Sequence, residues 1–455
     1  MDRREMAISF AHQNKERFLN ELIDLVRIPS VSTNPENAAD MQKTAIWLTE
    51  ELKKRGCKNI QIMPTPKHPV VYGECLDAGD DKPTVLIYGH YDLQPEDPVD
   101  LWRSGAFEPT VEGKYLVARG ASDMKGQIIA ALKAIESIQS TGKFPVNIKF
   151  ILEGEEEIGS PNLEAFMREH TDLLKCDFAL NPDAGMIAPN IPTIVYGLRG
   201  LAYLEIRVHG QKGDLHSGLY GGVVENPANV LCQLVAGMKD ADHHITLPGF
   251  YDRVRPLTDE ERSELGRLPL DEAFYLKGTG ANKLVGEKGY TWCERATARP
   301  TLDVNGIYSG YIGEGSKTVL PCYAMAKVSM RLVPDQDPEE VRQSMVKYIE
   351  ERLPDTMRYE LLVHAGNPAS ITDINTPGVK ALAKALEAVW GIRPVYKREG
   401  GSIPVVGHMQ EILNASSVLT GFGLPDDNIH APNEHLNLEV WYKGIDSLIH
   451  FFYNL

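Results

Sequence analysis

Short apolar runs that alternate with a helical segment constrain the fold of this chain most. The run TVLIYG (84–89) carries no charge, which is typical of a strand that other elements cover on both faces. Residues 122–138 place Ile128 and Leu132 on one helical face, and the strand-like run 146–152 follows. Strand, helix and strand in this order predict an α/β fold with a mostly parallel sheet and flanking helices.

The sequence pattern changes near Gly197, which predicts a second domain inserted into the first. LAYLEIRVHG (201–210) alternates like a half-buried strand, and 327–334 and 359–366 are further strand candidates. A chain of 455 residues also exceeds the size at which single cores stop growing. We predict an α+β insertion within an α/β domain. The predicted segments are 1–196 and 369–455 for the α/β domain and 197–368 for the insertion.

Charge and composition exclude several classes of partner. The net charge is −16, from 47 basic and 63 acidic residues, and no Lys/Arg block offsets it. We therefore expect no nucleic acid and no membrane as partners. The first 18 residues lack the apolar core of a signal peptide, and the six cysteines form no C-x-x-C pair. These features predict a cytoplasmic protein with reduced thiols.

Imidazole and carboxylate side chains stand where the predicted strands end. His90 follows TVLIYG directly, and in an extended segment Asp92, two positions on, points the same way. Asp123 begins the predicted helix, where the helix dipole favours a carboxylate. Asp183 follows the strand-like stretch CDFAL. Groups from successive strand ends meet at one edge of an open α/β sheet, where such folds bind ligands.

An acid cluster closes the strand at 146–152. Glu155, Glu156 and Glu157 are adjacent in ILEGEEEIGS, and three like charges in a row repel one another. A nearby cation explains this clustering better than a strand cap does, because metal ions bind carboxylates and unprotonated imidazoles.

Each residue also has an ordinary structural interpretation. Asp123 alone would usually be a helix cap and Asp183 a turn residue. His90 alone would be a satisfied buried imidazole as often as a metal ligand. The glutamates alone would be a solvated strand end. Their shared position at strand ends favours a common site. The sequence contains no P-loop, no G-x-S-x-G elbow and no H-E-x-x-H helix, and GTGANK (278–283) does not fit a dinucleotide motif.

Several motifs occur in an order that resembles a known family. They are GHYDLQP, GASDMKG, EGEEEIGS, NPDAG, GDLHSG, SMRLVP, REGGSIPV and NIHAPNE. This order is similar to that of the co-catalytic di-metal peptidases of aminoacylase, glutamate carboxypeptidase and carnosinase type. The sequence resembles the cytosolic non-specific dipeptidase branch most, over nearly the whole chain. The resemblance implies a catalytic domain interrupted by a lid domain that dimerises.

The resemblance also implies metal ligands and a general base. Asp123 would bridge two divalent metal ions, with Zn²⁺ or Mn²⁺ expected and Co²⁺ possible. The other implied ligands are His90 and Asp183 for one ion and Glu157 and His430 for the second. Asp92 would orient His90, Glu156 would activate a metal-bridging water, and Glu155 would be a bystander.

The substrate contacts rest on the resemblance as well. His216 would reach the neighbouring active site of a homodimer, and Arg331 would bind the C-terminal carboxylate of a small peptide. Thr318 and Ser402 would add hydrogen bonds. Without the resemblance, Arg331 would be an exposed strand residue and His216 a loop histidine.

The implied activity is metal-dependent hydrolysis of dipeptides or short peptides. Two alternatives stay open: an N-acyl amino acid amidohydrolase (a deacylase or desuccinylase), and a non-catalytic protein that binds amino acid derivatives. The segments NPDAGM and GYIGEGS depart from the expected pattern and leave the substrate preference open.

Overall fold

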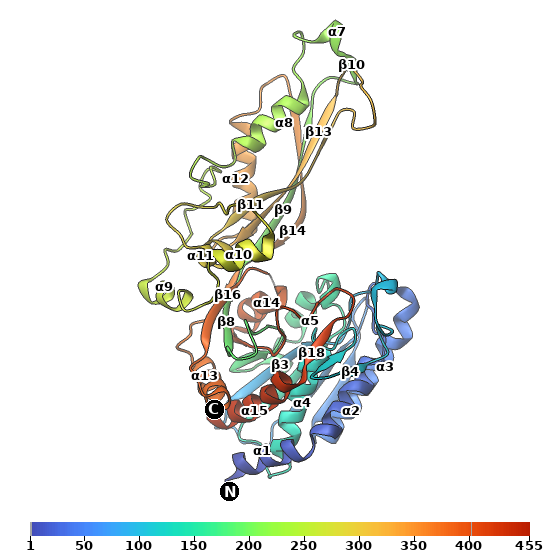
Figure 1. Cartoon of the computed structure of the whole chain (residues 1–455), viewed down its shortest axis with the longest axis vertical. Coiled ribbons are helices and arrows are strands. Elements are labelled where there is room, and N and C mark those ends of the chain that lie inside the picture. Colours follow the sequence, from blue (N-terminus) through green and yellow to red (C-terminus); the bar gives the residue numbers. More distant parts are fainter. Residues whose placement is uncertain (1, 402) are drawn as a thin grey trace. The chain divides into compact units, whose positions relative to one another are not determined.

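The computed structural model describes residues 2–401 and 403–455. The chain divides into two compact units. Figure 1 draws both units and labels their helices and strands. The first unit consists of Met1–Tyr196, Thr372–Tyr396 and Pro404–Leu455, and the second of Gly197–Ile371 and Lys397–Ile403.

A sheet with parallel central strands forms the middle of the first unit. Its strands lie in the order β1 (Lys58–Met63), β2 (Val70–Cys75), β6 (Asn147–Glu153), β3 (Thr84–His90), β7 (Phe178–Asn181), β17 (Ser416–Leu419) and β8 (Thr193–Leu198). The neighbours among β6, β3, β7 and β17 are parallel, whereas β1, β2 and β8 pair antiparallel. β15 (Ser370–Ile371) and β16 (Val395–Glu399) also pair with β8. The predicted α/β fold with a mostly parallel sheet is confirmed.

The central helix of the first unit is α4 (Lys125–Gln139), which is buried on almost every side. α4 packs against α15 (Leu438–Asn454), α1 (Arg3–Gln13) and α2 (Lys15–Val26), and α15 packs against α13 (Pro377–Trp390). Further α-helices of the first unit are α3 (Ala38–Lys54), α5 (Leu163–Glu169), α6 (Thr171–Leu174) and α14 (Pro404–Leu413). The prediction that Asp123 begins the helix needs correction, because residues 119–124 form a turn and α4 starts at Lys125.

A small sheet brings the C-terminal part of the chain beside this turn. β18 (His435–Asn437) pairs antiparallel with β5 (Tyr115–Val117), which pairs with β4 (Thr110–Glu112). Because β5 ends just before the turn, the segment that precedes β18 lies next to Asp123.

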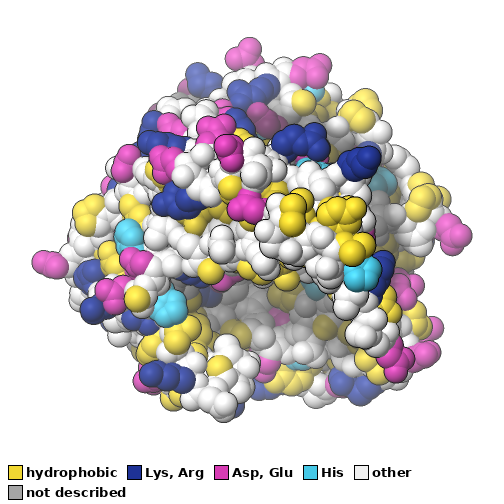
Figure 2. Space-filling model, turned by 90° about the horizontal axis from the view of Figure 1, so that it is seen from above, with side chains coloured by type: hydrophobic (Ala, Val, Ile, Leu, Met, Phe, Trp, Pro, Cys, Tyr) yellow, Lys and Arg dark blue, Asp and Glu magenta, His cyan; other side chains and the backbone are white. Residues whose placement is uncertain are grey.

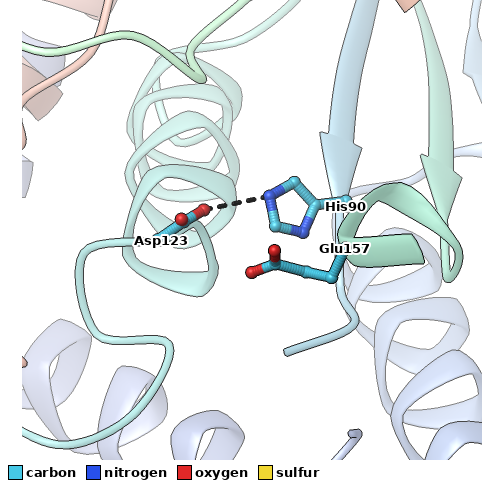
Figure 3. A group of neighbouring side chains, drawn as sticks. All are labelled: His90, Asp123 and Glu157. Carbon is cyan, nitrogen blue, oxygen red and sulfur yellow. Dashed lines mark hydrogen bonds and ion pairs between the residues drawn. The ribbon is translucent and has the colours of Figure 1, made fainter. Parts of the chain in front are cut away.

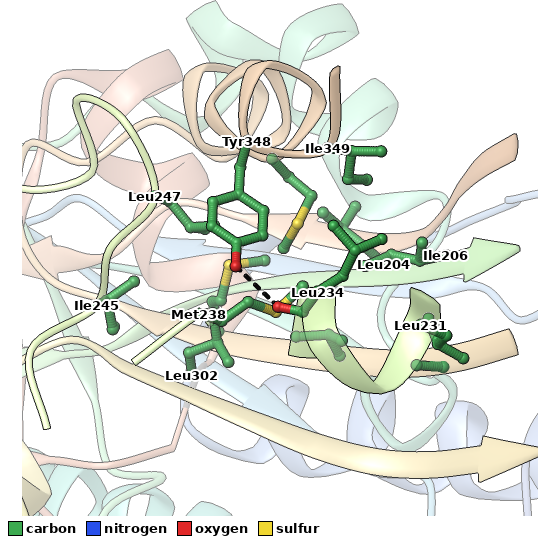
Figure 4. Close-up of a cluster of buried hydrophobic side chains, with 14 of the residues drawn as sticks. Leu204, Ile206, Leu231, Leu234, Met238, Ile245, Leu247, Leu302, Tyr348 and Ile349 are labelled. Atoms are coloured by element: carbon green, nitrogen blue, oxygen red, sulfur yellow. Dashed lines mark hydrogen bonds between the residues drawn. The ribbon is translucent and has the colours of Figure 1, made fainter. Parts of the chain in front are cut away.

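The second unit is built on an antiparallel sheet, as the alternating sequence pattern predicts. The strand order is β11 (Thr301–Ser309), β13 (Tyr323–Leu332), β9 (Gly200–His209) and β14 (Arg358–Asn367). Every second side chain of β13 is buried. α8 (Pro227–Ala236) packs on β13 and β9, and α12 (Pro338–Glu350) packs on β9 and β14. Figure 4 shows the resulting core, in which the hydroxyl of Tyr348 donates to the carbonyl of Leu234 at 2.8 Å.

The rest of the second unit is made of short elements. They are β10 (Leu215–His216), α7 (Ser217–Tyr220), α9 (Asp259–Leu265), α10 (Glu272–Thr279), α11 (Trp292–Thr297) and β12 (Val319–Leu320). Thr258 and Glu261 form a capping box at the start of α9. The sequence analysis missed β11, because this edge strand is largely exposed and lacks regular alternation.

Within the described residues, no helix is long and apolar enough to cross a membrane. On the face drawn in Figure 2, basic and acidic side chains lie interspersed over much of the surface.

We expect Leu204→Ala to destabilise the second unit strongly. Leu204 is 1% exposed within the core of Figure 4, so its truncation leaves a cavity and costs about 2–5 kcal/mol. Ile46→Ala is the control, because Ile46 is 54% exposed and its loss should change stability by less than about 0.5 kcal/mol. Urea unfolding followed by circular dichroism measures both. Equal losses for the two variants would contradict this core assignment.

Candidate active site

His90 is the last residue of the buried strand β3, and contacts with Asp92 fix the orientation of its ring. Nδ1 donates to the backbone oxygen of Asp92 at 3.2 Å and lies 3.5 Å from the Asp92 carboxylate. This contact leaves Nε2 facing Asp123, at 3.0 Å from Oδ1. A second group behind a histidine fixes its ring orientation and tautomer, as metal-binding imidazoles require.

The two oxygens of Asp123 face two different imidazoles. Oδ1 lies 3.0 Å from His90 Nε2, and Oδ2 lies 3.0 Å from His430 Nε2. Figure 3 shows His90, Asp123 and Glu157 converging from the end of β3, the turn before α4 and the segment after β6. One ligand atom from each of these three residues lies within 4.8 Å of the others.

The three adjacent glutamates have different surroundings. Glu157 lies 3.2 Å from His430 Nε2 and accepts a hydrogen bond from Gln94 at 2.8 Å. The backbone N–H groups of Glu156 and Glu157 donate to the two oxygens of Asp92, at 3.1 and 3.0 Å.

Glu155 points to other partners. Its carboxylate is buried and accepts hydrogen bonds from the backbone N–H of His68 at 2.8 Å and from Asn162 at 2.7 Å. Glu155 therefore anchors the loop that contains His68.

Asp183 completes the set at the end of β7. Its Oδ1 lies 3.9 Å from His90 Nε2, and its backbone N–H donates to Asn181 at 2.9 Å. The structure thus gathers all five predicted ligands in the first unit: His90, Asp123, Glu157, Asp183 and His430.

The carboxylates of this site change one another's pKa values. Burial raises the pKa of Glu156 to about 7; the charge of His90 opposes this shift, and the charges of Glu157 and Asp123 add to it. Burial also raises the pKa of Asp183 well above its ordinary value, with the same opposition from His90. Negative charge is therefore in excess here.

The imidazoles respond in the opposite direction. Hydrogen bonds to Asp123 and Glu157 raise the pKa of His430 to about 10. Burial disfavours a proton on His90, but its hydrogen bonds to Asp123 and Asp92 outweigh burial and raise its pKa well above normal. The raised pKa values favour protons on both imidazoles, and a bound cation would compete with those protons. Two imidazoles and three carboxylates, without a thiolate, fit Zn²⁺ and also Mn²⁺ or Co²⁺.

Three further predicted residues come from other parts of the chain. His216 ends β10, where its Nδ1 accepts a hydrogen bond from the N–H of Gly218 at 3.0 Å. Thr318 accepts a backbone hydrogen bond from Ser217 at 3.1 Å, and Arg331 lies on β13. These residues belong to the second unit, and their substrate roles stay predictions. Ser402 lies outside the described residues.

The sequence analysis missed two polar residues around the site. Gln94 holds Glu157, and it continues the alternation of His90 and Asp92, which could have identified it. Glu434 holds the turn that carries Asp123, and only the pairing of β18 with β5 reveals this role.

Imidazoles and carboxylates that surround one bridging aspartate, beside a buried glutamate with a raised pKa, are characteristic of metal-dependent hydrolases. The comparisons with known proteins agree with this class. The model of peptidase family M20/M25/M40 matches residues 86–454, and the chain belongs to this family. It is a metallopeptidase.

Three relatives illustrate the similarity. The chain is 31% identical to the Cys-Gly metallodipeptidase DUG1 of Candida albicans, over 95% of this chain and 93% of that protein. It is 33% identical to the human Beta-Ala-His dipeptidase, over 86% of this chain and 78% of that protein. A solved M20 family metallo-carboxypeptidase from Sulfolobus solfataricus is 35% identical, with a TM-score of 0.83, covering 96% of this chain and 98% of that chain.

We expect Asp123→Asn to abolish tight metal binding. The amide replaces one of the two oxygens that face His90 and His430, so zinc affinity should fall by more than about 100-fold. Titration of the metal-free protein against a chromogenic chelator measures this. Asp446→Asn is the control, because Asp446 pairs with His12 at 2.8 Å outside the site. Unchanged zinc affinity in Asp123→Asn would contradict the assignment.

Proposed function

We propose that this chain hydrolyses dipeptides or short peptides that carry a free C-terminal carboxylate, using two divalent metal ions. The observation that carries the proposal is the placement of Asp123 between His90 and His430, whose Nε2 atoms each lie 3.0 Å from one of its oxygens. A carboxylate in this position can bind two cations at once. The names of the relatives, Cys-Gly metallodipeptidase and Beta-Ala-His dipeptidase, support dipeptides as the substrate class.

Each metal ion has its own proposed ligands in addition to Asp123. His90 and Asp183 would hold one ion, and Glu157 and His430 the other. Zn²⁺ or Mn²⁺ suits this donor set, and Co²⁺ is compatible with it. When bound, the ions lower the pKa of water and polarise the scissile carbonyl.

Glu156 is the proposed general base. Its pKa of about 7, raised by burial, lets it take a proton from the attacking water at neutral pH. The protonated Glu156 then donates that proton to the nitrogen of the leaving amine. Asp92 supports this step because it fixes the backbone of Glu156 through a 3.1 Å hydrogen bond.

Four further residues are proposed to contact the substrate. Arg331 would bind the C-terminal carboxylate, for which a planar guanidinium is well suited. His216 would donate a hydrogen bond to the negative oxygen of the tetrahedral intermediate. Thr318 and Ser402 would bind the peptide by further hydrogen bonds.

We also propose that the second unit forms a homodimer. Large apolar side chains are exposed on α7 and β11 and in the segments that follow them; they include Leu219 (72% exposed), Val223 (77%), Ile307 (54%) and Ile312 (78%). Apolar surface of this kind favours burial against a partner. A second copy of the chain fits this role, because the edge strand β11 is itself exposed.

The six free cysteines support a reducing, cytoplasmic location.

We expect Glu156→Gln to retain metal and lose activity. Loss of the general base should lower kcat/KM for a dipeptide panel by about 10²–10⁴-fold, with metal content unchanged. Glu155→Gln is the matched control, because Glu155 contacts His68 and Asn162 outside the metal-ligand cluster and should keep the parent rate.

The same panel should include tripeptides and N-acyl amino acids. Faster turnover of N-acyl amino acids than of dipeptides would identify an amidohydrolase instead. Parent activity in Glu156→Gln would contradict the mechanism, and the absence of all hydrolysis by the metal-loaded parent would favour a binding protein.

We expect two inactive variants to restore activity when they are mixed. If His216 acts in the neighbouring subunit, a His216→Ala chain paired with a Glu156→Gln chain assembles one complete site per mixed dimer. Random exchange should then recover about a quarter of the parent activity. Mixing after subunit exchange, monitored by light scattering, measures this. No recovery from dimers that do exchange would show that His216 does not act across the interface.

A further inference from the structure

Glu434 is a buried carboxylate that accepts hydrogen bonds at both oxygens. Oε1 accepts from the backbone N–H groups of Ser122 and Asp123, each at 3.0 Å. Oε2 accepts from the guanidinium of Arg119 at 2.9 Å and from the N–H of Gly120 at 3.0 Å. All four donors belong to the turn that carries Asp123 into the site, so a single side chain holds this whole turn.

The backbone of Glu434 is fixed by the small sheet. Ala118 donates its N–H to the carbonyl of Glu434 at 3.0 Å, beside the pairing of β18 with β5. The side chain then folds back over residues 119–123. Gly120 has a φ of +81°, and a Cβ there would lie 2.4 Å from Leu93, so the turn requires a glycine.

A second buried carboxylate holds the same turn from the other end of the loop. Asp427 accepts from the hydroxyl of Ser122 at 2.6 Å and from the N–H of Leu424 at 2.8 Å. The carbonyl of Asp427 accepts the N–H of His435 at 2.9 Å, which closes the loop that carries His430. The loop that carries His430 is therefore joined to the turn that carries Asp123 at two points, through Asp427 before His430 and through Glu434 after it.

We propose that Glu434 is a positioning residue. It holds Asp123 and His430 close enough to bind the same metal ion before that ion arrives. The inference rests on the proposed metal site. Glu434 contacts the backbone of Asp123 and is four residues from His430, so it couples the two loops that supply these ligands. Preorganised ligands bind metal more tightly, because the chain pays less ordering entropy on binding.

A purely structural role makes a different prediction. A buried Glu–Arg pair that only stabilises the fold would lower stability when it is removed, without a selective effect on metal affinity. Glu51 provides the matched comparison within the first unit. It is equally buried and accepts from Arg55 at 2.8 Å and from Lys54 at 2.6 Å. It also lies 3.6 Å from Lys133 of α4, but none of these partners belongs to the turn that carries Asp123.

We expect Glu434→Gln to weaken zinc binding by about 10–100-fold, whereas Glu51→Gln leaves it unchanged. The amide must present an NH₂ group to one of the two donor pairs that the carboxylate accepts, which displaces the turn. Zinc affinity is measured by titration of the metal-free full-length chain against a chromogenic chelator. At saturating zinc, kcat should fall while KM for a dipeptide stays near the parent value.

The outcomes separate this inference from the proposed function. Parent-like zinc affinity in a folded Glu434→Gln, or an equal loss in Glu51→Gln, overturns the positioning role while the metal site stands. Failure of the parent chain itself to bind zinc or manganese overturns the proposed function. If Glu434→Gln does not fold, Glu434→Asp replaces it: the charge stays, but the shorter side chain cannot reach all four donors. Zinc affinity should again fall, and parent-like affinity would contradict the inference.

Discussion

The carboxylate of Asp123 is shared between two imidazoles, and the arrangement of the site depends on this contact. His90 reaches it from the end of a central strand, and His430 reaches it from a loop more than three hundred residues later in the chain. The parallel strands bring one partner, and the small sheet of β5 and β18 brings the other. Neither element alone places two imidazoles on opposite oxygens of one carboxylate.

The same convergence creates an electrostatic cost that a cation removes. Burial of Glu156 and Asp183 beside Asp123 raises the pKa of both groups, because the charged forms lose water and repel one another. In the metal-free chain, the imidazoles offset part of this charge by binding protons. Divalent ions would displace those protons and neutralise the carboxylates, so metal binding and protonation are linked.

Much of the fold and part of the site follow from local sequence patterns. The apolar runs around 84–89 and 146–152 predicted strands of a parallel sheet, and alternation placed His90 and Asp92 together. His430 could be assigned only through family resemblance, because no local pattern connects it with Asp123.

Other features depend on tertiary contacts that the sequence does not display. The turn before α4, which begins at Lys125, is held by Glu434 through the backbone N–H groups of Ser122 and Asp123. Strand β11 pairs along one edge with β13 and exposes most of its side chains, so its sequence lacks the alternation that marks β9. The pattern of apolar residues in the sequence therefore predicts the buried central elements well. Edge strands and hydrogen bonds between distant residues become visible only in the structure.

Anomalous diffraction from zinc-loaded crystals of the parent chain would test the bridging role of Asp123 most directly. We predict two zinc peaks about 3.5–4 Å apart, one on each side of the Asp123 carboxylate, with His90 on one ion and His430 on the other. A single peak, or two peaks that do not share Asp123, would contradict the proposed centre.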